Sequence, residues 1–306
     1  MKILITGATG LVGTQLVKTL LEKGYNDLSI LTRDPKAAQK KFNAPIQAFV
    51  WDPYENLIDD EALRDVDVIV HLAGENIGTK RWDDARKEEI LKSRVLGTDL
   101  LVQTILRKQY YPQKFLSSSA VGIYGNTKDQ VAQTDSTRGQ DFLAQVCQDW
   151  ESALLTADIP NCQKVCLRTG MVLSPTGGAL EKMLPPFKLG LGGILGNGEQ
   201  YMSWIHIQDL VNQFIFLIEN PILHSAYNAV SPNPVTNAEF TKTLGDVLNR
   251  LTIFPVPEFM LKLLFGEMST LLLEGQKVLP TEFLNSDYHF QFPILKEALE
   301  NVLKQN

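Results

Sequence analysis

The chain has 306 residues, 44% of them hydrophobic, so it can bury a large core without the help of disulfides or a metal ion. Its 29 basic and 35 acidic residues give a net charge of −6 spread along the sequence, which argues against nucleic acid or a membrane as a partner. The three cysteines lack a CxxC spacing and predict neither a disulfide framework nor a metal site. With no signal peptide and no long apolar run, the chain is expected to be cytoplasmic.

Short β-branched runs alternate with longer helical patterns in the first half, which is typical of a parallel sheet covered by helices on both faces. We therefore predict an α/β fold with a doubly wound parallel Rossmann sheet in the order 3-2-1-4-5-6, whose ligand crevice lies at the carboxyl ends of the strands. Helices are expected over about residues 11–23, 83–107 and 141–156. The predicted strands are 2–6, 28–32, 47–51, 68–72, 115–118 and 164–168.

The second half has a looser pattern. A Gly/Pro-rich stretch, 177–198, is expected to be a lid or substrate-facing loop. An apolar helix is predicted near 210–218, and the residues after Pro232 are mostly helical with Pro punctuation. The predicted division is a cofactor-binding domain over 1–230, with the lid near 175–200, and a small helical substrate lobe over 231–306.

The motif ITGATGLVG follows the first predicted strand and opens the first helix. Gly7 permits a tight turn, Gly10 lets the backbone approach a pyrophosphate, and Gly13 lets the helix pack closely on the strand. The amino end of the helix offers free amides and a partial positive charge to phosphates. The motif predicts dinucleotide binding, with contacts also from its neighbours Thr6, Leu11 and Val12.

The end of the second strand selects the cofactor, because a carboxylate there binds a ribose 2′-hydroxyl whereas an arginine pairs with a 2′-phosphate. The sequence is LTRDP, which places Thr32 and Arg33 at this position, about 20 residues after the glycine motif. NADP(H) is therefore predicted over NAD(H). The alternative is that Asp34 binds the ribose and Arg33 is only solvated.

At this point the chain resembles a known family. The glycine spacing, the HLAG turn after strand four and the SSSAVGIYG run after strand five resemble the extended short-chain dehydrogenases of the nucleotide-sugar epimerase type. HLAGENIG, the RW that follows it, GNGEQYMSWIHIQDL and FGEMSTLLLEGQKVLP resemble the "epimerase family protein" branch, which carries its own small C-terminal domain. The resemblance covers nearly the whole chain.

The resemblance implies roles for particular residues. Ala73 and Gly74 would pass close to the cofactor, Asp52 would lie near the adenine, and Ser119 would be the catalytic serine. Arg168 ends the sixth strand and is predicted to contact a phosphate or carboxylate, with a structural ion pair as the equal alternative. Leu72 and Ser117 complete the predicted cofactor contacts.

The family's Tyr-x3-Lys pair is missing from the expected helix, DFLAQVCQDWESALL, where Leu143 and Cys147 occupy those places. We interpret Cys147 as a packing residue. Of two literal Tyr-x3-Lys matches, 110–114 precedes the fifth strand and contains a proline, so it is a decoy, and 124–128 falls in a turn. Tyr124 is the candidate replacement proton donor, and packing in the loop is the alternative.

Substrate candidates follow from the same loops. Residues after the HLAG turn could face the substrate or could cap the next segment, and those from the later motif line the substrate side in related proteins. A lone histidine such as His206 is more often structural, and Lys87 is better explained as a solvated helix residue. The predicted substrate residues are Glu75, Asn76, Arg81, Trp82, Gln200, Trp204 and His206.

Together these residues predict an NADP(H)-binding, epimerase-like oxidoreductase that acts on a small polar substrate of the nucleotide-sugar type. The alternative is a non-catalytic NADP(H)-binding sensor or regulatory protein on the same fold. The sequence leaves open whether the protein is a homodimer.

Overall fold

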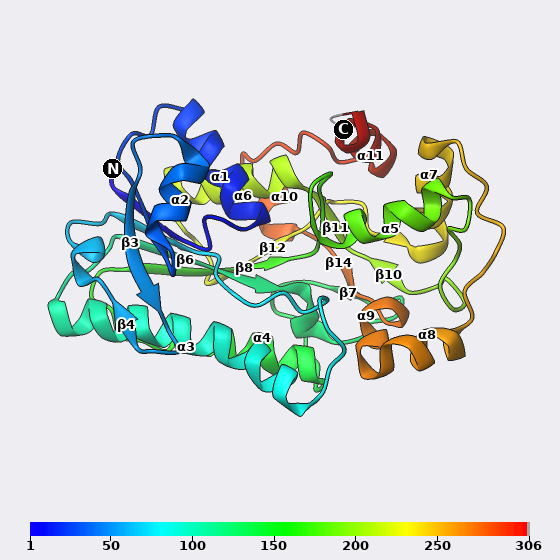
Figure 1. Ribbon diagram of the computed structural model, residues 1–306, viewed down its shortest axis with the longest axis horizontal. Helices are drawn as coiled ribbons and strands as arrows, with labels where there is room; N and C mark the ends of the chain where they lie inside the picture. Colours follow the sequence, from blue (N-terminus) through cyan, green and yellow to red (C-terminus); the bar gives the residue numbers. More distant parts are fainter. Residues whose placement is uncertain (305–306) are drawn as a thin grey trace.

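The computed structural model describes residues 1–304 and is built on one eight-stranded sheet in the order β12-β8-β6-β5-β1-β2-β3-β4 (Figure 1). Every pairing is parallel except that of β3 with β4. The six predicted strands hold the order 3-2-1-4-5-6, which confirms the predicted fold class. The strands are β1 (Ile3–Thr6), β2 (Leu28–Thr32), β3 (Gln47–Asp52), β4 (Leu57–Ile58), β5 (Val68–His71), β6 (Lys114–Ala120), β8 (Gln163–Thr169) and β12 (Ala226–Ala229).

Two edge strands were not predicted. β12 has the sequence AYNA, which lacks the β-branched run typical of a strand, and β4 has only two residues. The central strands β1 and β5 are buried at every position, as expected for parallel strands covered on both faces. A seventh parallel strand therefore closes the edge beside β8.

Helices cover both faces of the sheet (Figure 1). One face carries α1 (Leu11–Glu22), α2 (Pro35–Phe42) and α6 (Ile207–Glu219). The other carries α3 (Asp84–Lys108) and α4 (Phe142–Leu155), which pack side by side. Two apolar clusters fill the spaces between the helices and the sheet, and they hold the carboxyl ends of β1, β5, β6 and β8 at one edge.

A separate apolar cluster forms a second lobe from α5 (Gly178–Lys188), α7 (Asn237–Leu248) and α11 (Leu295–Lys304), with buried Trp204 between them. The Gly/Pro-rich stretch was expected to be a loop, but its first half is helix α5. Leu180, Leu184 and Phe187 recur at helical spacing and are 0%, 5% and 4% exposed, so their burial outweighs the local composition. The domain division at residue 231 stays a prediction.

The remaining elements are short. They are β7 (Val131–Ala132) with β14 (Lys277–Val278), β9 (Met171–Leu173) with β11 (Trp204–His206), β10 (Tyr201–Met202) with β13 (Val235–Thr236), η1 (Asp60–Leu63), η2 (Val121–Tyr124), η3 (Gly266–Ser269), α8 (Glu258–Phe265), α9 (Thr270–Leu273) and α10 (Thr281–Leu284). Among the helices of residues 1–304, none is long and apolar enough to cross a membrane.

Candidate dinucleotide site

The glycine turn between β1 and α1 has no room for side chains at two of its positions. Gly7 adopts a φ of +67°, and a Cβ there would lie 2.7 Å from the carbonyl carbon of Leu72. A Cβ on Gly13 would lie 2.3 Å from the Gly7 oxygen, so the helix can only pack on the turn with glycine here. A Cβ on Gly10 would meet only the Gly7 oxygen, at 3.2 Å, which leaves its other side open. Since Gly10 has no side chain to cap α1, the first amides of the helix remain available to an anion.

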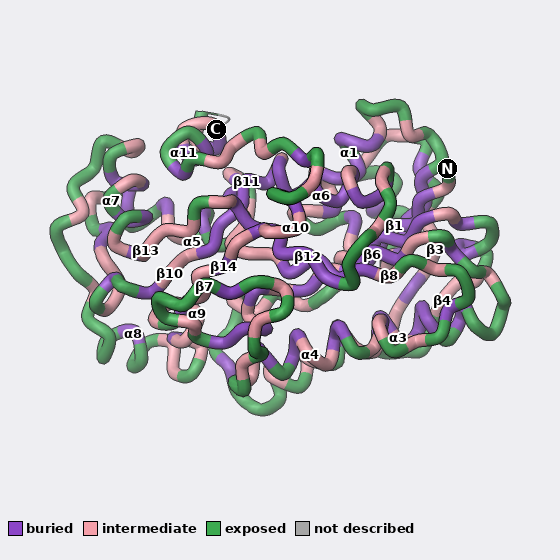
Figure 2. Tube along the Cα trace, turned by 180° about the vertical axis from the view of Figure 1, so that it is seen from behind, coloured by how far each residue is buried: buried purple, intermediate pink, exposed green. Residues whose placement is uncertain are grey.

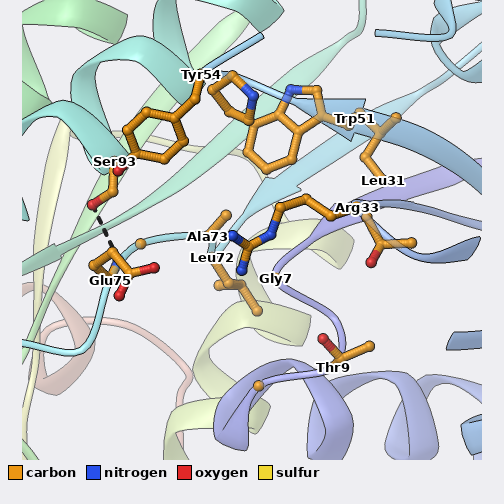
Figure 3. Close-up of a pocket in the computed structure, with 14 residues that line it drawn as sticks. Gly7, Thr9, Leu31, Arg33, Trp51, Tyr54, Leu72, Ala73, Glu75 and Ser93 are labelled. Atoms are coloured by element: carbon orange, nitrogen blue, oxygen red, sulfur yellow. Dashed lines mark hydrogen bonds between the residues drawn. The ribbon is translucent and has the colours of Figure 1, made fainter. Parts of the chain in front are cut away.

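A cavity of about 250 Å³ lies where β1, β2, β3 and β5 end (Figure 3). It brings together the glycine turn, the end of the second strand and the turn after β5, three segments that the sequence analysis assigned to one cofactor. The predicted residues that line it are Gly7, Gly10, Thr32, Arg33, Leu72, Ala73, Gly74 and Glu75. The lining residues that the sequence analysis missed are Thr9, Leu31, Trp51, Pro53, Tyr54 and Ser93.

Cationic side chains lie on the side of this pocket next to the glycine turn. The exposed Arg33 extends over the pocket toward Ala73 (Figure 3). From α2, Lys41 Nζ donates a hydrogen bond of 2.7 Å to the carbonyl oxygen of Thr9. Asp34 accepts a hydrogen bond of 3.0 Å from the Ala37 amide and so caps α2. The carboxylate of Asp34 at this strand end therefore caps α2, whereas Arg33 lines the pocket and Lys41 lies beside its glycine turn.

Aromatic rings form the opposite side. The rings of Trp51 and Tyr54 lie next to each other at the end of β3 (Figure 3). Trp51 is 5% exposed, and its indole Nε1 has no hydrogen-bond partner among the described residues. Burial, followed by the negative charges of Glu75 and Glu89, raises the pKa of Tyr54. Asp52 does not line the cavity but accepts a hydrogen bond of 3.0 Å from the Tyr54 amide and shapes this turn. The sequence WDPY combines a turn signal with two flanking aromatic residues, and it could have indicated that Trp51 and Tyr54 line a pocket at this strand end.

Thr6, a predicted cofactor contact, does not line the cavity but supports a backbone turn that does. Its hydroxyl lies 2.7 Å from Nδ1 of His71 and accepts a hydrogen bond of 3.3 Å from the Ala73 amide. Burial lowers the pKa of His71 to about 3, so its neutral ring can accept the threonine proton. These two hydrogen bonds fix the backbone turn after β5, which lines the cavity.

Three other predicted cofactor residues lie outside the cavity. Leu11 begins α1, and a Cβ on Gly177 would lie 3.1 Å from its Cδ1, so the start of α5 lies against the first residue of α1. Val12 is partly buried against the core beside the sheet, and Ser117 is fully buried with its hydroxyl 3.1 Å from the carbonyl oxygen of Ser118.

The predicted catalytic residues belong to a buried polar network at the ends of β6 and β8. Ser119 donates a hydrogen bond of 2.8 Å to Oε1 of Glu151, and Arg168 donates to both carboxylate oxygens of Glu151, at 2.8 and 2.9 Å. Arg168 also donates to the Tyr124 hydroxyl at 2.9 Å, and that hydroxyl donates to Asn228 at 2.6 Å. The guanidinium of Arg168 is thus held in an ion pair. Burial raises the pKa of Tyr124 despite the neighbouring cation.

Leu143 and Cys147 lie against the turn after β6, in the places of the missing Tyr and Lys. A Cβ on Gly122 would lie 3.5 Å from the Leu143 Cβ and 4.0 Å from the Cys147 sulfur. Burial raises the pKa of Cys147 to about 12, so its thiol stays protonated. Neither side chain can exchange a proton with a substrate at neutral pH.

The loop after β5 is held by two arginines of α3. Arg86 pairs with the Glu75 carboxylate at 3.4 Å, and Arg94 donates to the Glu75 carbonyl oxygen at 3.0 Å. Asn76 closes a turn by accepting from the Gly78 amide at 2.9 Å. Trp82 is 9% exposed and donates to the Ile77 carbonyl oxygen at 2.8 Å. Of these, Glu75 alone lines the cavity.

Arg81 is exposed and lies beside η3, where a Cβ on Gly266 would be 2.8 Å from its guanidinium. Lys87 pairs with Glu267 of η3 at 2.5 Å. These two cations therefore place η3 next to the amino end of α3.

The three residues predicted from the later motif are buried in the second lobe. Gln200 donates to the Leu195 and Leu272 carbonyl oxygens at 3.1 and 2.7 Å. Trp204 is fully buried. His206 stacks on Phe292 at 3.9 Å and accepts the Gln208 amide at 3.1 Å, and burial lowers its pKa to about 4. None of the three lines the cavity.

The sheet order, the glycine turn and the pocket at the strand ends define a dinucleotide-binding protein of the Rossmann type. The chain belongs to the NAD dependent epimerase/dehydratase family, whose model matches residues 3–229. Residues 256–302 match a second model, described as a domain of unknown function, DUF1731. These matches confirm the predicted family and its distinct C-terminal segment.

Relatives extend over the whole chain. The human epimerase family protein SDR39U1 is 34% identical over 309 residues, which cover 99% of this chain and 100% of the relative. An epimerase family protein of Mycobacterium tuberculosis is 38% identical over 296 residues, 96% of this chain and 95% of its own length. The crystal structure of human SDR39U1 (isoform 2) with NADPH matches all of both chains, with a TM-score of 0.87 and 33% identity.

Proposed function

We propose that this chain binds NADP(H) in the pocket at the ends of β1, β2, β3 and β5. The glycine turn and α1 would hold the pyrophosphate, and Arg33 with Lys41 would hold the 2′-phosphate. The observation that carries the proposal is that Asp34 caps α2 while Arg33 lines the pocket and Lys41 lies beside its glycine turn, bonded to the Thr9 carbonyl oxygen. A 2′-hydroxyl would require a free carboxylate here. The NADPH in the human relative supports the same cofactor.

With this cofactor we propose an epimerase-like oxidoreductase whose substrate is a small polar molecule of the nucleotide-sugar type. The bound cofactor would supply hydride transfer. Ser119 would polarise the substrate oxygen by turning its hydroxyl from Glu151, which keeps both hydrogen bonds from Arg168. Tyr124 is the assigned proton donor, although its hydroxyl is already bonded to Asn228. Glu75 lies at the pocket and would contact the substrate.

A second function is favoured by that same network. Both candidate hydroxyls donate to other buried side chains, and Cys147 is protonated where the family has a lysine. A protein with these features can hold NADP(H) without turning it over. It would then sense the nucleotide or present it to a partner.

Cofactor choice is tested by titration calorimetry with NADPH and NADH. Wild type should bind NADPH more tightly, and Arg33→Ala should weaken NADPH by roughly tenfold or more while NADH changes little, since a charge-assisted contact is worth about 1.5–3 kcal/mol. Equal affinities of the wild type for both nucleotides would refute the 2′-phosphate site.

Turnover is tested by following NADPH oxidation with carbonyl substrates and nucleotide sugars. Ser119→Ala and Tyr124→Phe should each slow turnover, with thermal unfolding measured alongside to separate a catalytic loss from a loss of fold. Rates unchanged in both variants would remove the assigned roles. Tight NADPH binding with no turnover across the panel would favour the sensor.

A further inference from the structure

Two lining residues of the dinucleotide pocket, Tyr54 and Glu75, have no part in the phosphate contacts proposed above. Those contacts belong to Arg33, Lys41 and the first amides of α1. A carboxylate repels a phosphate, so the charge of Glu75 favours an uncharged part of the dinucleotide on its side of the pocket. The base is such a part, and the residues on this side determine which base fits.

Tyr54 is an aromatic residue that is held in place without being buried. It lies in the turn between β3 and β4, residues 53–56, and is 46% exposed. Figure 2 shows β3 and β4 at one end of the molecule, with exposed chain beside them. The Tyr54 amide donates a hydrogen bond of 3.0 Å to Asp52, and its hydroxyl donates one of 3.4 Å to the carbonyl oxygen of Glu89 on α3. The ring therefore spans from the sheet to α3, and its accessible surface in the pocket can stack on a flat base.

Glu75 is the one carboxylate among the cavity's lining residues in the described part of the chain. Its amide donates to Ser93 Oγ at 3.1 Å, and its carbonyl oxygen accepts from Arg94 at 3.0 Å. Both partners are on α3, the helix that also accepts the Tyr54 hydroxyl. After burial, the charge of Glu75 contributes to the raised pKa of Tyr54, as expected for neighbouring side chains. Tyr54 and Glu75 therefore share the α3 side of the pocket (Figure 3).

The carboxylate of Glu75 keeps one oxygen available. Its Oε2 lies 3.4 Å from Nη1 of Arg86, and the same nitrogen donates to Glu89 at 2.5 Å, so Arg86 has a closer partner. Within residues 1–304, Oε1 of Glu75 accepts no hydrogen bond, and the side chain is 32% exposed. The nearby carboxylates of Asp34 and Asp52 already accept from backbone amides. Glu75 is thus the carboxylate that offers a free acceptor to an N–H group of a ligand in this pocket.

Hydrogen-bond chemistry indicates which base such an acceptor selects. Adenine carries an exocyclic amine, which is a donor, at the position where guanine and hypoxanthine carry a carbonyl oxygen. A carboxylate accepts a hydrogen bond from the amine, whereas it repels the carbonyl oxygen. An unpaired carboxylate oxygen beside an accessible aromatic ring therefore favours adenine.

We propose that Glu75 selects adenine by accepting a hydrogen bond from its exocyclic amine, with the base stacked on Tyr54. The inference rests on the proposed binding of NADP(H). It assigns the base to Glu75 instead of Asp52, which the family resemblance placed near the adenine but which does not line the cavity. The base contact also takes the place of the substrate contact proposed above for Glu75, because Oε1 is the one unpaired oxygen of that carboxylate within residues 1–304.

Titration calorimetry with NADPH and with reduced nicotinamide hypoxanthine dinucleotide phosphate, the hypoxanthine analogue, tests the role of Glu75. Wild type should bind NADPH roughly tenfold or more tightly than the analogue, because the analogue loses a charge-assisted hydrogen bond. In Glu75→Gln this ratio should fall to about threefold or less, since an amide can accept from the amine or donate to the carbonyl. The analogue should bind this variant more tightly than wild type, whereas a structural defect would weaken both nucleotides. Glu88→Gln, which removes an exposed carboxylate of α3 outside the pocket, should keep the wild-type ratio.

The same titrations test stacking on Tyr54. Tyr54→Ala should weaken NADPH and the analogue by the same factor, roughly tenfold, because stacking does not depend on the exocyclic group. Tyr54→Phe keeps the ring and should bind both nucleotides like wild type. Tyr111→Ala is the matched control, because Tyr111 is 42% exposed and precedes β6, outside the pocket. Thermal unfolding of each variant should show that the fold is kept.

Equal affinities of wild type for NADPH and the analogue would overturn the base contact and return Glu75 to the substrate. A wild-type ratio in Glu75→Gln would have the same meaning, and unchanged affinities in Tyr54→Ala would remove the stacking. In each of these cases tight NADPH binding would leave the proposed cofactor site standing. A wild type that binds neither nucleotide would refute the cofactor site and the base contact together.

Discussion

The hydroxyl of Ser119 donates a hydrogen bond of 2.8 Å to Glu151, a carboxylate on α4 that is 1% exposed. Glu151 lies one helical turn after Cys147, which occupies the place of the family's lysine. The same carboxylate holds Arg168 at the end of β8. In this chain α4 therefore contributes an anion that ties two strand ends together, where the typical family contributes a cation beside the nicotinamide.

Glu151→Gln should destabilise the fold strongly, because it leaves the 3% exposed Arg168 without its charge partner. Breaking a buried ion pair from one side costs about 3–5 kcal/mol. Urea unfolding measures this loss. Glu258→Gln, which breaks the exposed pair with Lys262, is the control and should change stability by about 0.5 kcal/mol or less. Equal effects of the two substitutions would show that the buried network does not hold the strand ends.

Lys41→Ala should weaken NADPH binding by about three- to tenfold and leave NADH binding unchanged, since its ammonium lies beside the glycine turn through Thr9. Titration calorimetry at low salt provides the comparison. Its neighbour Lys40 is also exposed on α2 and forms no side-chain hydrogen bond or ion pair with residues 1–304, so Lys40→Ala should bind both nucleotides like wild type. An equal loss of NADPH affinity in Lys40→Ala would mean that Lys41 contributes only general attraction between positive charge and phosphate.

Gly10→Ala and Gly13→Ala should separate binding from folding. A methyl group at Gly10 would point to open space apart from the Gly7 oxygen, so Gly10→Ala should fold normally and lose NADPH affinity by tenfold or more, about 1.4 kcal/mol. A methyl group at Gly13 would clash with the turn, so Gly13→Ala should lose about 1–3 kcal/mol of unfolding free energy. Thermal unfolding and calorimetry on both variants give the two readouts. An unstable Gly10→Ala, or an unaffected Gly13→Ala, would contradict this division of roles.

Sequence patterns predict best the parts of the site that are formed by residues close together in the chain. The glycine turn and Arg33 follow from a strand, a turn and a helix that adjoin in the chain, so their shared pocket could be expected. Lys41 and Ser93 reach the site from helices whose rotation about their axes is set by tertiary packing, and no local motif marks them. The pairing of Arg168 with Glu151 likewise depends on how α4 packs on β8. The glycine and proline content of this stretch led to the wrong prediction of a loop at α5. There the burial of apolar side chains such as Leu184 outweighs the low helix propensity of glycine and proline.

Acid should destabilise the protein through His206, which is buried in the second lobe. Burial lowers its pKa to about 4 in the fold, against about 6.5 in the unfolded chain. Between pH 4 and 6.5 the histidine is protonated in the unfolded chain but neutral in the folded protein. The free energy of unfolding is therefore highest above pH 6.5 and decreases as the pH falls. Between pH 7 and 5 this histidine should account for roughly 2 kcal/mol of lost stability.

Urea unfolding at pH 7, 6 and 5 provides the test for His206. His206→Gln removes the titrating group and keeps a side chain that can bond to Asn301, so its stability should fall less steeply than that of wild type. His289→Gln is the control, because His289 is exposed, and its curve should run parallel to wild type. Buried His71 is present in all three proteins and adds the same slope to each. Parallel curves for all three proteins would mean that His206 accepts its proton within the folded lobe, against the burial seen there.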